Sequence, residues 1–308
     1  MSNNFNKING LIVAPFTPMN PDRSINYDLI KKQASIFSNN KLSGVFICGT
    51  TGESLSLTIE ERMQISEKWK KYINKQLLLI VHVGSECLLY AKELAKHAQS
   101  IGANAIATIG PTFFRPSSIK DLVEFCYEIA SAAPELPFYY YHIPSMTGLN
   151  FKMNEFLKYA ENRISNLAGI KYTYEDLYDF NRCMEYKNSK YDILFGRDEI
   201  LLAGLSLGAK GAVGSFYNFA SPIFYQILLN FNKGNIERAQ QLQKKVQDFT
   251  EIYFKFGGNV ATGKAIMRIA GLDCGPVRLP LVDLPKPQYD AMKKELDKID
   301  FKKWFVTI

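Results

Sequence analysis

Short apolar runs alternate with longer amphipathic segments over the first two thirds of the chain, and this alternation restricts the fold more than any other feature. The runs are apolar throughout rather than at every second position, which is typical of parallel strands buried on both faces. The eight runs lie at residues 11–14, 44–48, 77–83, 105–109, 137–143, 167–170, 192–195 and 211–214. The amphipathic segments between them, which we predict to be helices, include 27–39, 58–73, 88–101 and 118–132.

The order of strand and helix, repeated eight times, predicts an α/β protein with a (β/α)8 TIM barrel. Thr58 and Glu61 form a capping-box motif at the start of one predicted helix, and Ser118 with Asp121 resembles another helix start. Periodicity alone is also compatible with a doubly wound open sheet. Eight successive units, without a G-x-G-x-x-G motif after the first run, favour the closed barrel.

After residue 218 the pattern changes to helices alone. The predicted helices lie at 221–231, 234–256, 259–270 and 286–297. No Gly/Ser-rich linker sets this part apart, and barrels of this type commonly reach such a length as one domain. We therefore predict a single domain over residues 1–308, with a barrel core at 8–218 and a C-terminal helical extension at 219–308.

Composition argues against several classes of protein. The 37 basic and 30 acidic residues give a net charge of +7, but no block of like charges forms, so we expect no nucleic-acid partner. Residues 1–9 lack the apolar core of a signal peptide, and no apolar stretch reaches about 18 residues. We therefore expect no membrane association. The five cysteines have no C-x-x-C pair, which favours reduced thiols and a cytoplasmic location. His82, His97 and His142 show no spacing typical of metal ligands.

Lys171 follows the apolar run at 167–170 and is the first candidate for chemistry. A lysine that a strand delivers into a protein interior is costly to keep charged, which favours the neutral, nucleophilic amine. This placement indicates Schiff-base chemistry on a carbonyl substrate. The alternative is a lysine that reaches solvent or pairs with a carboxylate, since unpaired lysines are rarely buried.

Polar residues also follow other runs, at the carboxyl ends of strands where barrels of this type form their active sites. The segment G-T-T-G-E-S at 49–54 offers backbone amides and two hydroxyls that suit a substrate carboxylate, although a simple glycine turn is equally compatible. Tyr139 and Tyr141 share one face of their strand, so Tyr141 is predicted to reach the same cavity as Lys171 and transfer protons. A tyrosine packed in the core is the alternative.

Asp198 and Glu199 follow the seventh run, and Ser215 follows the eighth. Two carboxylates and a hydroxyl at the mouth of a barrel suit the binding of a polyol. They equally suit the capping of the helices that follow, because acidic and hydroxyl side chains favour helix N-termini.

Four motifs in order match a known family: G-T-T-G-E-S at 49–54, Y-Y-H-I-P at 140–144, G-I-K-Y-T at 169–173 and G-A-V-G-S at 211–215. The chain resembles, over essentially its full length, the pyruvate-dependent class I aldolases typified by N-acetylneuraminate lyase and dihydrodipicolinate synthase. The resemblance implies that Lys171 forms the Schiff base, so that no cofactor is needed. It also implies that Thr50 and Thr51 hold the substrate carboxylate, that Tyr141 carries protons, and that the protein is a homotetramer.

Within this family, two places separate the possible substrates. Met146 stands where the synthases carry an arginine for a second carboxylate. In the lyases, a set of polar positions holds the hydroxylated tail of sialic acid. The residues of this chain that match them are Thr173, Gly196, Asp198, Glu199 and Ser215. The resemblance therefore implies reversible cleavage of N-acetylneuraminate to pyruvate and N-acetylmannosamine.

The chain departs from the synthases at Phe113, where they carry a tyrosine that a neighbouring subunit contributes. Without that hydroxyl, protons have to pass through Tyr141 and the substrate itself. The alternatives are another pyruvate-dependent aldolase, either like dihydrodipicolinate synthase or acting on a keto-deoxy sugar acid, and a homologue that binds a keto acid without turning it over.

Overall fold

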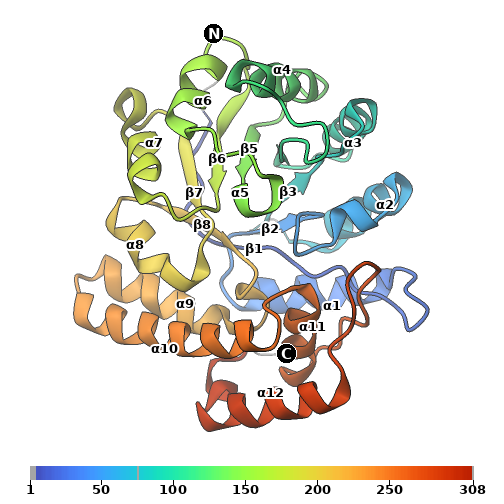
Figure 1. The fold of residues 1–308 in the computed structure, drawn as a ribbon, viewed down its shortest axis with the longest axis vertical. Helices are drawn as coiled ribbons and strands as arrows, with labels where there is room; N and C mark the ends of the chain where they lie inside the picture. The colour runs from blue at the N-terminus through green and yellow to red at the C-terminus, as the bar shows by residue number, and fades with distance from the viewer. Residues whose placement is uncertain (1–4, 75, 307–308) are drawn as a thin grey trace.

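The computed structural model describes residues 5–74 and 76–306; residues 1–4, 75 and 307–308, which fall within the predicted single domain, lie outside the described residues. Eight parallel strands form a closed barrel in which each strand pairs with the next along the chain and β8 pairs with β1 (Figure 1). The strands are β1 Gly10–Val13, β2 Gly44–Ile47, β3 Leu78–His82, β4 Ala105–Thr108, β5 Phe138–His142, β6 Leu167–Tyr172, β7 Asp192–Phe195 and β8 Gly211–Gly214. The predicted (β/α)8 TIM barrel is confirmed, and each predicted run overlaps one strand.

Helices surround the strands in a ring (Figure 1). They are α1 Tyr27–Asn39, α2 Ile59–Tyr72, α3 Leu88–Ser100, α4 Ile119–Ala130, α5 Pro144–Thr147, α6 Met153–Ala160, α7 Leu177–Ser189, α8 Leu201–Ser206 and α9 Tyr217–Asn232. Both predicted helix starts are confirmed. Thr58 and Glu61 form a reciprocal capping box at α2, and the Ser118 hydroxyl accepts a hydrogen bond from the backbone N–H of Asp121 at α4.

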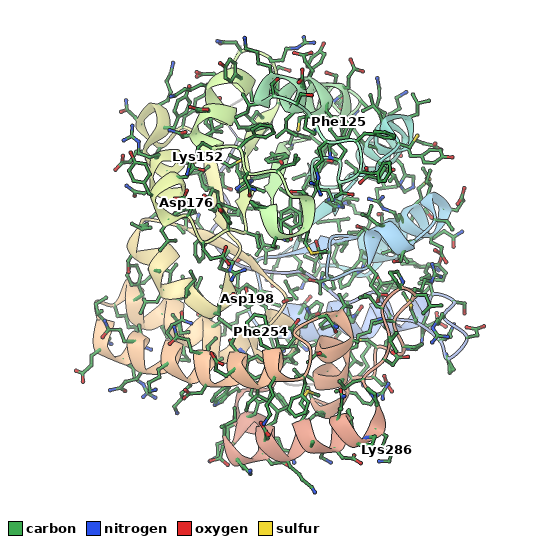
Figure 2. All side chains as sticks on the ribbon, viewed as in Figure 1. Phe125, Lys152, Asp176, Asp198, Phe254 and Lys286 are labelled. Atoms are coloured by element: carbon green, nitrogen blue, oxygen red, sulfur yellow. The ribbon has the colours of Figure 1, made fainter. Side chains whose placement is uncertain are left out.

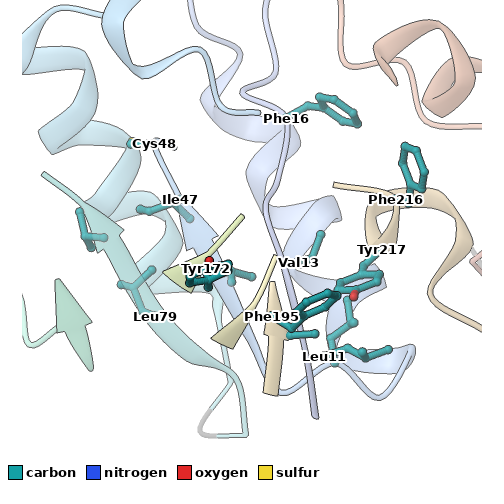
Figure 3. Close-up of a cluster of buried hydrophobic side chains, with 14 of the residues drawn as sticks. Leu11, Val13, Phe16, Ile47, Cys48, Leu79, Tyr172, Phe195, Phe216 and Tyr217 are labelled. Atoms are coloured by element: carbon teal, nitrogen blue, oxygen red, sulfur yellow. The ribbon is translucent and has the colours of Figure 1, made fainter. Parts of the chain in front are cut away.

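The strands are buried on both faces, as their apolar runs predict. Leu11 and Val13 of β1 point outward into the layer between strands and helices, where Phe195 and Tyr217 also lie (Figure 3). Ile12, between them, belongs to the second cluster inside the barrel. Successive side chains of a strand point to opposite faces, so one apolar residue in two fills the barrel interior.

The orientation of Lys171 follows from the same alternation. Strand β6 continues to Tyr172, two residues beyond the predicted run. Ile170 and Tyr172 belong to the outer apolar layer, so the residue between them faces the interior. Lys171 is therefore delivered into the barrel near the carboxyl end of its strand.

The C-terminal part of the chain is helical, as predicted. Helix α9 packs on β1 and α8, in the position of the eighth barrel helix, and the predicted division between residues 218 and 219 falls inside it. The helices α10 Ile236–Lys255, α11 Val260–Ile269 and α12 Lys286–Lys298 follow. We refer to residues 236–306 as the C-terminal helices. They lie together along one side of the barrel (Figure 1). Within the described part of the chain, no helix has the length and apolar character needed to cross a membrane.

Candidate active site

Lys171 lies inside the barrel with 4% of its surface exposed. Strands β5 and β6 pair in register so that Tyr141 stands opposite Lys171. The lysine Nζ lies 3.8 Å from the ring centroid of Tyr141 and 4.2 Å from that of Phe46. Among the described residues no carboxylate forms an ion pair with this amine. The alternative of a lysine neutralised by an acidic partner therefore finds no support in the geometry.

Tyr141 connects the lysine to the turn after β2. Its hydroxyl lies 3.5 Å from Oγ1 of Thr50. Its ring meets Phe46 edge-on, with centroids 5.6 Å apart and planes at 77°, and meets His82 at 6.2 Å and 90°. These edge-on contacts fix the plane of the phenol. The structure thus brings together three of the predicted site residues, Lys171, Tyr141 and Thr50.

The turn at residues 49–54, which we call the Thr50 turn, carries Thr50 and Thr51 and is closed by its own backbone hydrogen bonds. The N–H of Glu53 donates to the carbonyl of Thr50 at 3.1 Å, and the N–H of Ser54 donates to that of Gly49 at 3.2 Å. The Thr17 hydroxyl also donates to the carbonyl of Gly52 at 2.7 Å. Thr50 and Thr51 are half-buried. Both hydroxyls thus lie at the carboxyl end of the barrel, on a turn held by neighbouring backbone.

His82 packs beside Tyr141 in the site. The sequence pattern predicts no catalytic role for it. Its Nδ1 lies 2.8 Å from the carbonyl of Cys48, and its Nε2 accepts a hydrogen bond from the N–H of Ile109 at 3.3 Å. Burial, and next the nearby charge of Arg62, hold the pKa of His82 well below its ordinary value. His82 is thus a neutral, hydrogen-bonded residue that packs against Tyr141.

Phe46 was missed entirely by reasoning from the sequence. It is one residue of an apolar strand, and its residue type does not indicate that it faces the interior of the barrel. The alternation of β2 was the available signal, since Val45 and Ile47 belong to the outer layer and Phe46 to the inner one.

Asp198 lies after β7, in the short helix η2 Asp198–Ile200, and is 5% exposed. Its Oδ2 accepts a hydrogen bond from the N–H of Phe216 at 2.8 Å, and the carboxylate also accepts hydrogen bonds from the backbone N–H of Ser215 and the hydroxyl of Tyr217. Burial raises the pKa of Asp198 to about 7, Glu199 adds to the rise, and the Phe216 N–H and the charge of Lys171 oppose it. Figure 2 places Asp198 toward the centre of the molecule, whereas Lys286 lies at its outer edge.

Thr173 and Gly196 form a close pair at the ends of β6 and β7. The Thr173 hydroxyl is buried, and its oxygen has no partner in the part of the chain that the structure describes. A Cβ atom on Gly196 would lie 2.0 Å from that oxygen. Gly196 therefore leaves room for the Thr173 hydroxyl.

The remaining predicted residues, Glu199 in η2 and Ser215 directly after β8, differ in what they contact. The Glu199 carboxylate forms an ion pair with Arg197 at 2.7 Å, and Arg197 also pairs with Glu175 at 2.5 Å. Ser215 is half-buried, and its carbonyl accepts a hydrogen bond from the side-chain amide of Asn218. Within the described residues, neither Glu199 nor Ser215 forms a hydrogen bond or ion pair with Lys171 or Tyr141.

The site thus combines a buried amine with polar groups that follow several strands. The Thr50 turn follows β2, whereas Thr173 and Asp198 follow β6 and β7. A buried amine beside hydroxyls and a carboxyl suits a small polar substrate that has a carbonyl carbon. Among residues 5–74 and 76–306, no three His, Cys, Asp or Glu side chains are grouped to hold a metal ion.

Comparison with known proteins identifies the family of this chain. The sequence profile of the dihydrodipicolinate synthetase family matches residues 7–299. The chain belongs to this family. The family resemblance carried by the four motifs is thereby confirmed.

Similar members share most of their length with this chain. N-acetylneuraminate lyase A of Xenopus laevis is 40% identical over 299 residues, covering 96% of this chain and 97% of that protein. N-acetylneuraminate lyase of Gallus gallus is 40% identical over 297 residues, covering 95% and 96%. The solved structure of Proteus mirabilis N-acetylneuraminate lyase aligns with a TM-score of 0.93 at 40% identity, covering 96% of this chain and 100% of that one.

Proposed function

We propose that this protein is an N-acetylneuraminate lyase, a class I aldolase that reversibly cleaves N-acetylneuraminate to pyruvate and N-acetylmannosamine. The observation that carries the proposal is the buried amine of Lys171, 3.8 Å from the ring of Tyr141 and without an acidic partner among the described residues. Relatives named as N-acetylneuraminate lyases, 40% identical over nearly the whole chain, support the choice of substrate.

The first half of the reaction forms an imine on Lys171. The amine attacks the ketone carbon of the open-chain substrate, and a nitrogen–carbon bond forms as the carbonyl oxygen takes up a proton. Loss of that oxygen as water leaves a protonated imine, which accepts electrons from the neighbouring carbon–carbon bond. The rings of Phe46 and Tyr141 line the amine and keep bulk water away from it.

The second half breaks the carbon–carbon bond. Tyr141 relays the proton of the substrate hydroxyl next to that bond to the substrate carboxylate, and the bonding electrons move into the imine to give an enamine. N-acetylmannosamine leaves as the aldehyde. Protonation of the enamine carbon restores the imine, and water hydrolyses it to release pyruvate and the free amine of Lys171. Phe113 has no hydroxyl and takes no part in this relay.

The two ends of the cavity recognise the two ends of the substrate. Thr50 and Thr51 with their backbone amides bind the carboxylate, as hydroxyls and N–H groups of a tight turn suit an anion. The hydroxylated tail binds at the opposite end. The residues proposed to hold it are Thr173, Gly196, Asp198, Glu199 and Ser215. Met146 supplies no charge for a second carboxylate, which disfavours the product of the synthases.

An assay of pyruvate release from N-acetylneuraminate, coupled to lactate dehydrogenase, tests this function directly. Sustained release by the wild-type protein supports it. Trapping of pyruvate by borohydride without cleavage of N-acetylneuraminate would favour another pyruvate-dependent aldolase. Stabilisation by pyruvate without any trapping would favour a binding protein that lacks catalysis.

Asp198 is expected to make the stability of the protein depend on pH. Its folded pKa of about 7 exceeds its ordinary value of 3.8, so between these values the folded state binds more protons than the unfolded state. The free energy of unfolding therefore falls as pH rises through this range, by about 1.4 kcal/mol for each unit of pH. Melting temperatures from pH 5 to 8.5 should show this fall in the wild type and a weaker one in Asp198→Asn. Parallel curves for the two proteins would contradict the assignment.

A homotetramer in the cytoplasm completes the proposal. Phe113 and Phe114 are 79% and 83% exposed on the loop after β4, and Glu86 holds this loop by accepting hydrogen bonds from the N–H groups of Thr112 and Phe113. Two large apolar side chains held at the surface suit burial against a second copy of the chain. All five cysteines lie in the described part and carry free thiols, which favours a reducing compartment.

A further inference from the structure

Glu53 anchors the Thr50 turn to the C-terminal helices. It has a left-handed backbone with φ of 57°, and its side chain is fully buried. One carboxylate oxygen, Oε1, lies 2.7 Å from Nζ of Lys264 in α11. The other, Oε2, accepts a hydrogen bond from the backbone N–H of Arg278 at 2.9 Å. Both oxygens of a residue in the turn are therefore held by residues from the far end of the chain.

Lys264 and Arg278 are themselves fixed in place. The Lys264 side chain is 3% exposed, and its amine also donates to the carbonyl of Pro276 at 2.6 Å. The Arg278 guanidinium donates to both carboxylate oxygens of Glu61, at 2.5 and 2.6 Å, and to the carbonyl of Ser56 at 2.9 Å. A buried charge pair costs desolvation and is poor evidence for stability by itself, but removal of one partner leaves the other charge buried and unpaired.

The position of Glu53 decides the position of the two threonines. Its backbone N–H donates to the carbonyl of Thr50, and the N–H of Ser54 closes the same turn on Gly49. A shift of the Glu53 side chain would therefore move the hydroxyls and amides that receive the substrate carboxylate. Displacement of a binding group by about 1 Å is enough to weaken catalysis strongly.

A second contact from the C-terminal helices holds the segment that carries Asp198 and Glu199. Gln243 of α10 is buried, and its side-chain amide donates to the carbonyl of Glu199 at 3.0 Å and lies 3.5 Å from that of Asp198. Its side-chain oxygen accepts a hydrogen bond from the N–H of Leu202 at 2.9 Å. Gln243 thus fixes η2, the segment that carries Asp198 and Glu199.

From these two contacts we propose that the C-terminal helices position the two halves of the substrate site independently. Lys264, through Glu53, sets the carboxylate end, and Gln243 sets the end that receives the hydroxylated tail. Both are positioning residues, since they act through other side chains and backbone. The inference deepens the proposed function, because it assigns each contact to one part of an elongated keto-acid substrate.

The test uses Lys264→Met and Gln243→Leu, with Lys255→Met as a matched control. Lys255 forms an ion pair with Glu295 at 2.5 Å on the surface of the same helices, where it is 61% exposed. Steady-state kinetics in the direction of synthesis give separate KM values for pyruvate and N-acetylmannosamine. We expect Lys264→Met to raise the KM for pyruvate roughly tenfold and leave that for N-acetylmannosamine within about twofold. Gln243→Leu should raise the KM for N-acetylmannosamine and leave the KM for pyruvate within about twofold. Lys255→Met should change neither KM value.

A general loss of stability predicts a different pattern, in which both KM values change together in both variants; that pattern would overturn the inference. If Lys264→Met does not fold, the double variant Glu53→Gln with Lys264→Met removes both buried charges, and we expect it to fold with the same raised KM for pyruvate. A double variant with the wild-type KM for pyruvate would also overturn the inference.

Borohydride trapping separates this inference from the proposed function, because it requires pyruvate but no second substrate. Lys264→Met should raise the pyruvate concentration for half-maximal trapping, and Gln243→Leu should leave it unchanged. If the wild type traps pyruvate but does not cleave N-acetylneuraminate, the proposed function fails while these two results still support the inference. Equal shifts in both variants would contradict it.

Discussion

Replacement of Lys171 by Met is expected to abolish turnover while leaving the barrel folded. The nucleophile of a covalent mechanism has no substitute among the neighbouring groups, so kcat should fall by roughly four orders of magnitude or more. Met is similar in length and apolar, and it packs against Phe46 and Tyr141 without the cost of a buried amine. Stability should therefore be kept or increased, by about 1 kcal/mol or a few degrees in Tm.

Borohydride reduction in the presence of pyruvate, followed by peptide mass mapping, identifies the residue that forms the imine. The wild type should carry the adduct on the peptide that contains Lys171, and the variant should carry none. Lys152→Met is a suitable control, because Lys152 is 57% exposed and pairs with Asp176 on the surface (Figure 2). An adduct on another lysine would contradict the assignment. Unfolding of Lys171→Met would instead indicate a structural lysine.

The barrel could be predicted from the sequence because its strands carry a local signal. A parallel strand inside a ring of helices is apolar on both faces, so each one appears as a continuous run. The alternation of side chains also predicts correctly that Tyr139 and Tyr141 face the same side, and both belong to the inner cluster. The end of β6 was less clear, because Lys171 and Tyr172 do not look like the apolar run that they complete.

Asp198 and Glu199 illustrate what local patterns cannot separate. The two carboxylates are adjacent and equally polar, so the sequence gives no reason to assign them different surroundings. In the structure, Asp198 is 5% exposed and accepts a hydrogen bond from the N–H of Phe216, whereas Glu199 pairs with Arg197. The ion pair of Glu53 with Lys264 is harder still to predict, because its partners are far apart in the chain and meet through tertiary packing alone.

Replacement of Tyr141 by Phe is expected to lower kcat by about two to three orders of magnitude while changing the KM for N-acetylneuraminate little. The ring remains edge-on to Phe46 and His82, so the shape of the cavity is kept, but the hydroxyl 3.5 Å from Thr50 is lost. Positioned proton transfer typically contributes about 10²- to 10⁴-fold to a rate. Trapping of pyruvate by borohydride should still occur, more slowly, because Lys171 is unchanged.

Tyr139→Phe provides the matched control, since Tyr139 lies on the same face of β5 but nearer its amino end. Its hydroxyl donates to Oδ2 of Asp192 at 2.9 Å, a contact at the other end of the barrel. Loss of this buried hydrogen bond should lower the free energy of unfolding by about 1 to 3 kcal/mol and leave kcat near the wild-type value. Stopped-flow measurement of both variants, beside their melting temperatures, separates the two effects. A Tyr141→Phe protein with wild-type kcat would mean that the proton passes through the substrate or solvent alone. Among the described residues, no other phenol of the inner cluster contacts the amine of Lys171.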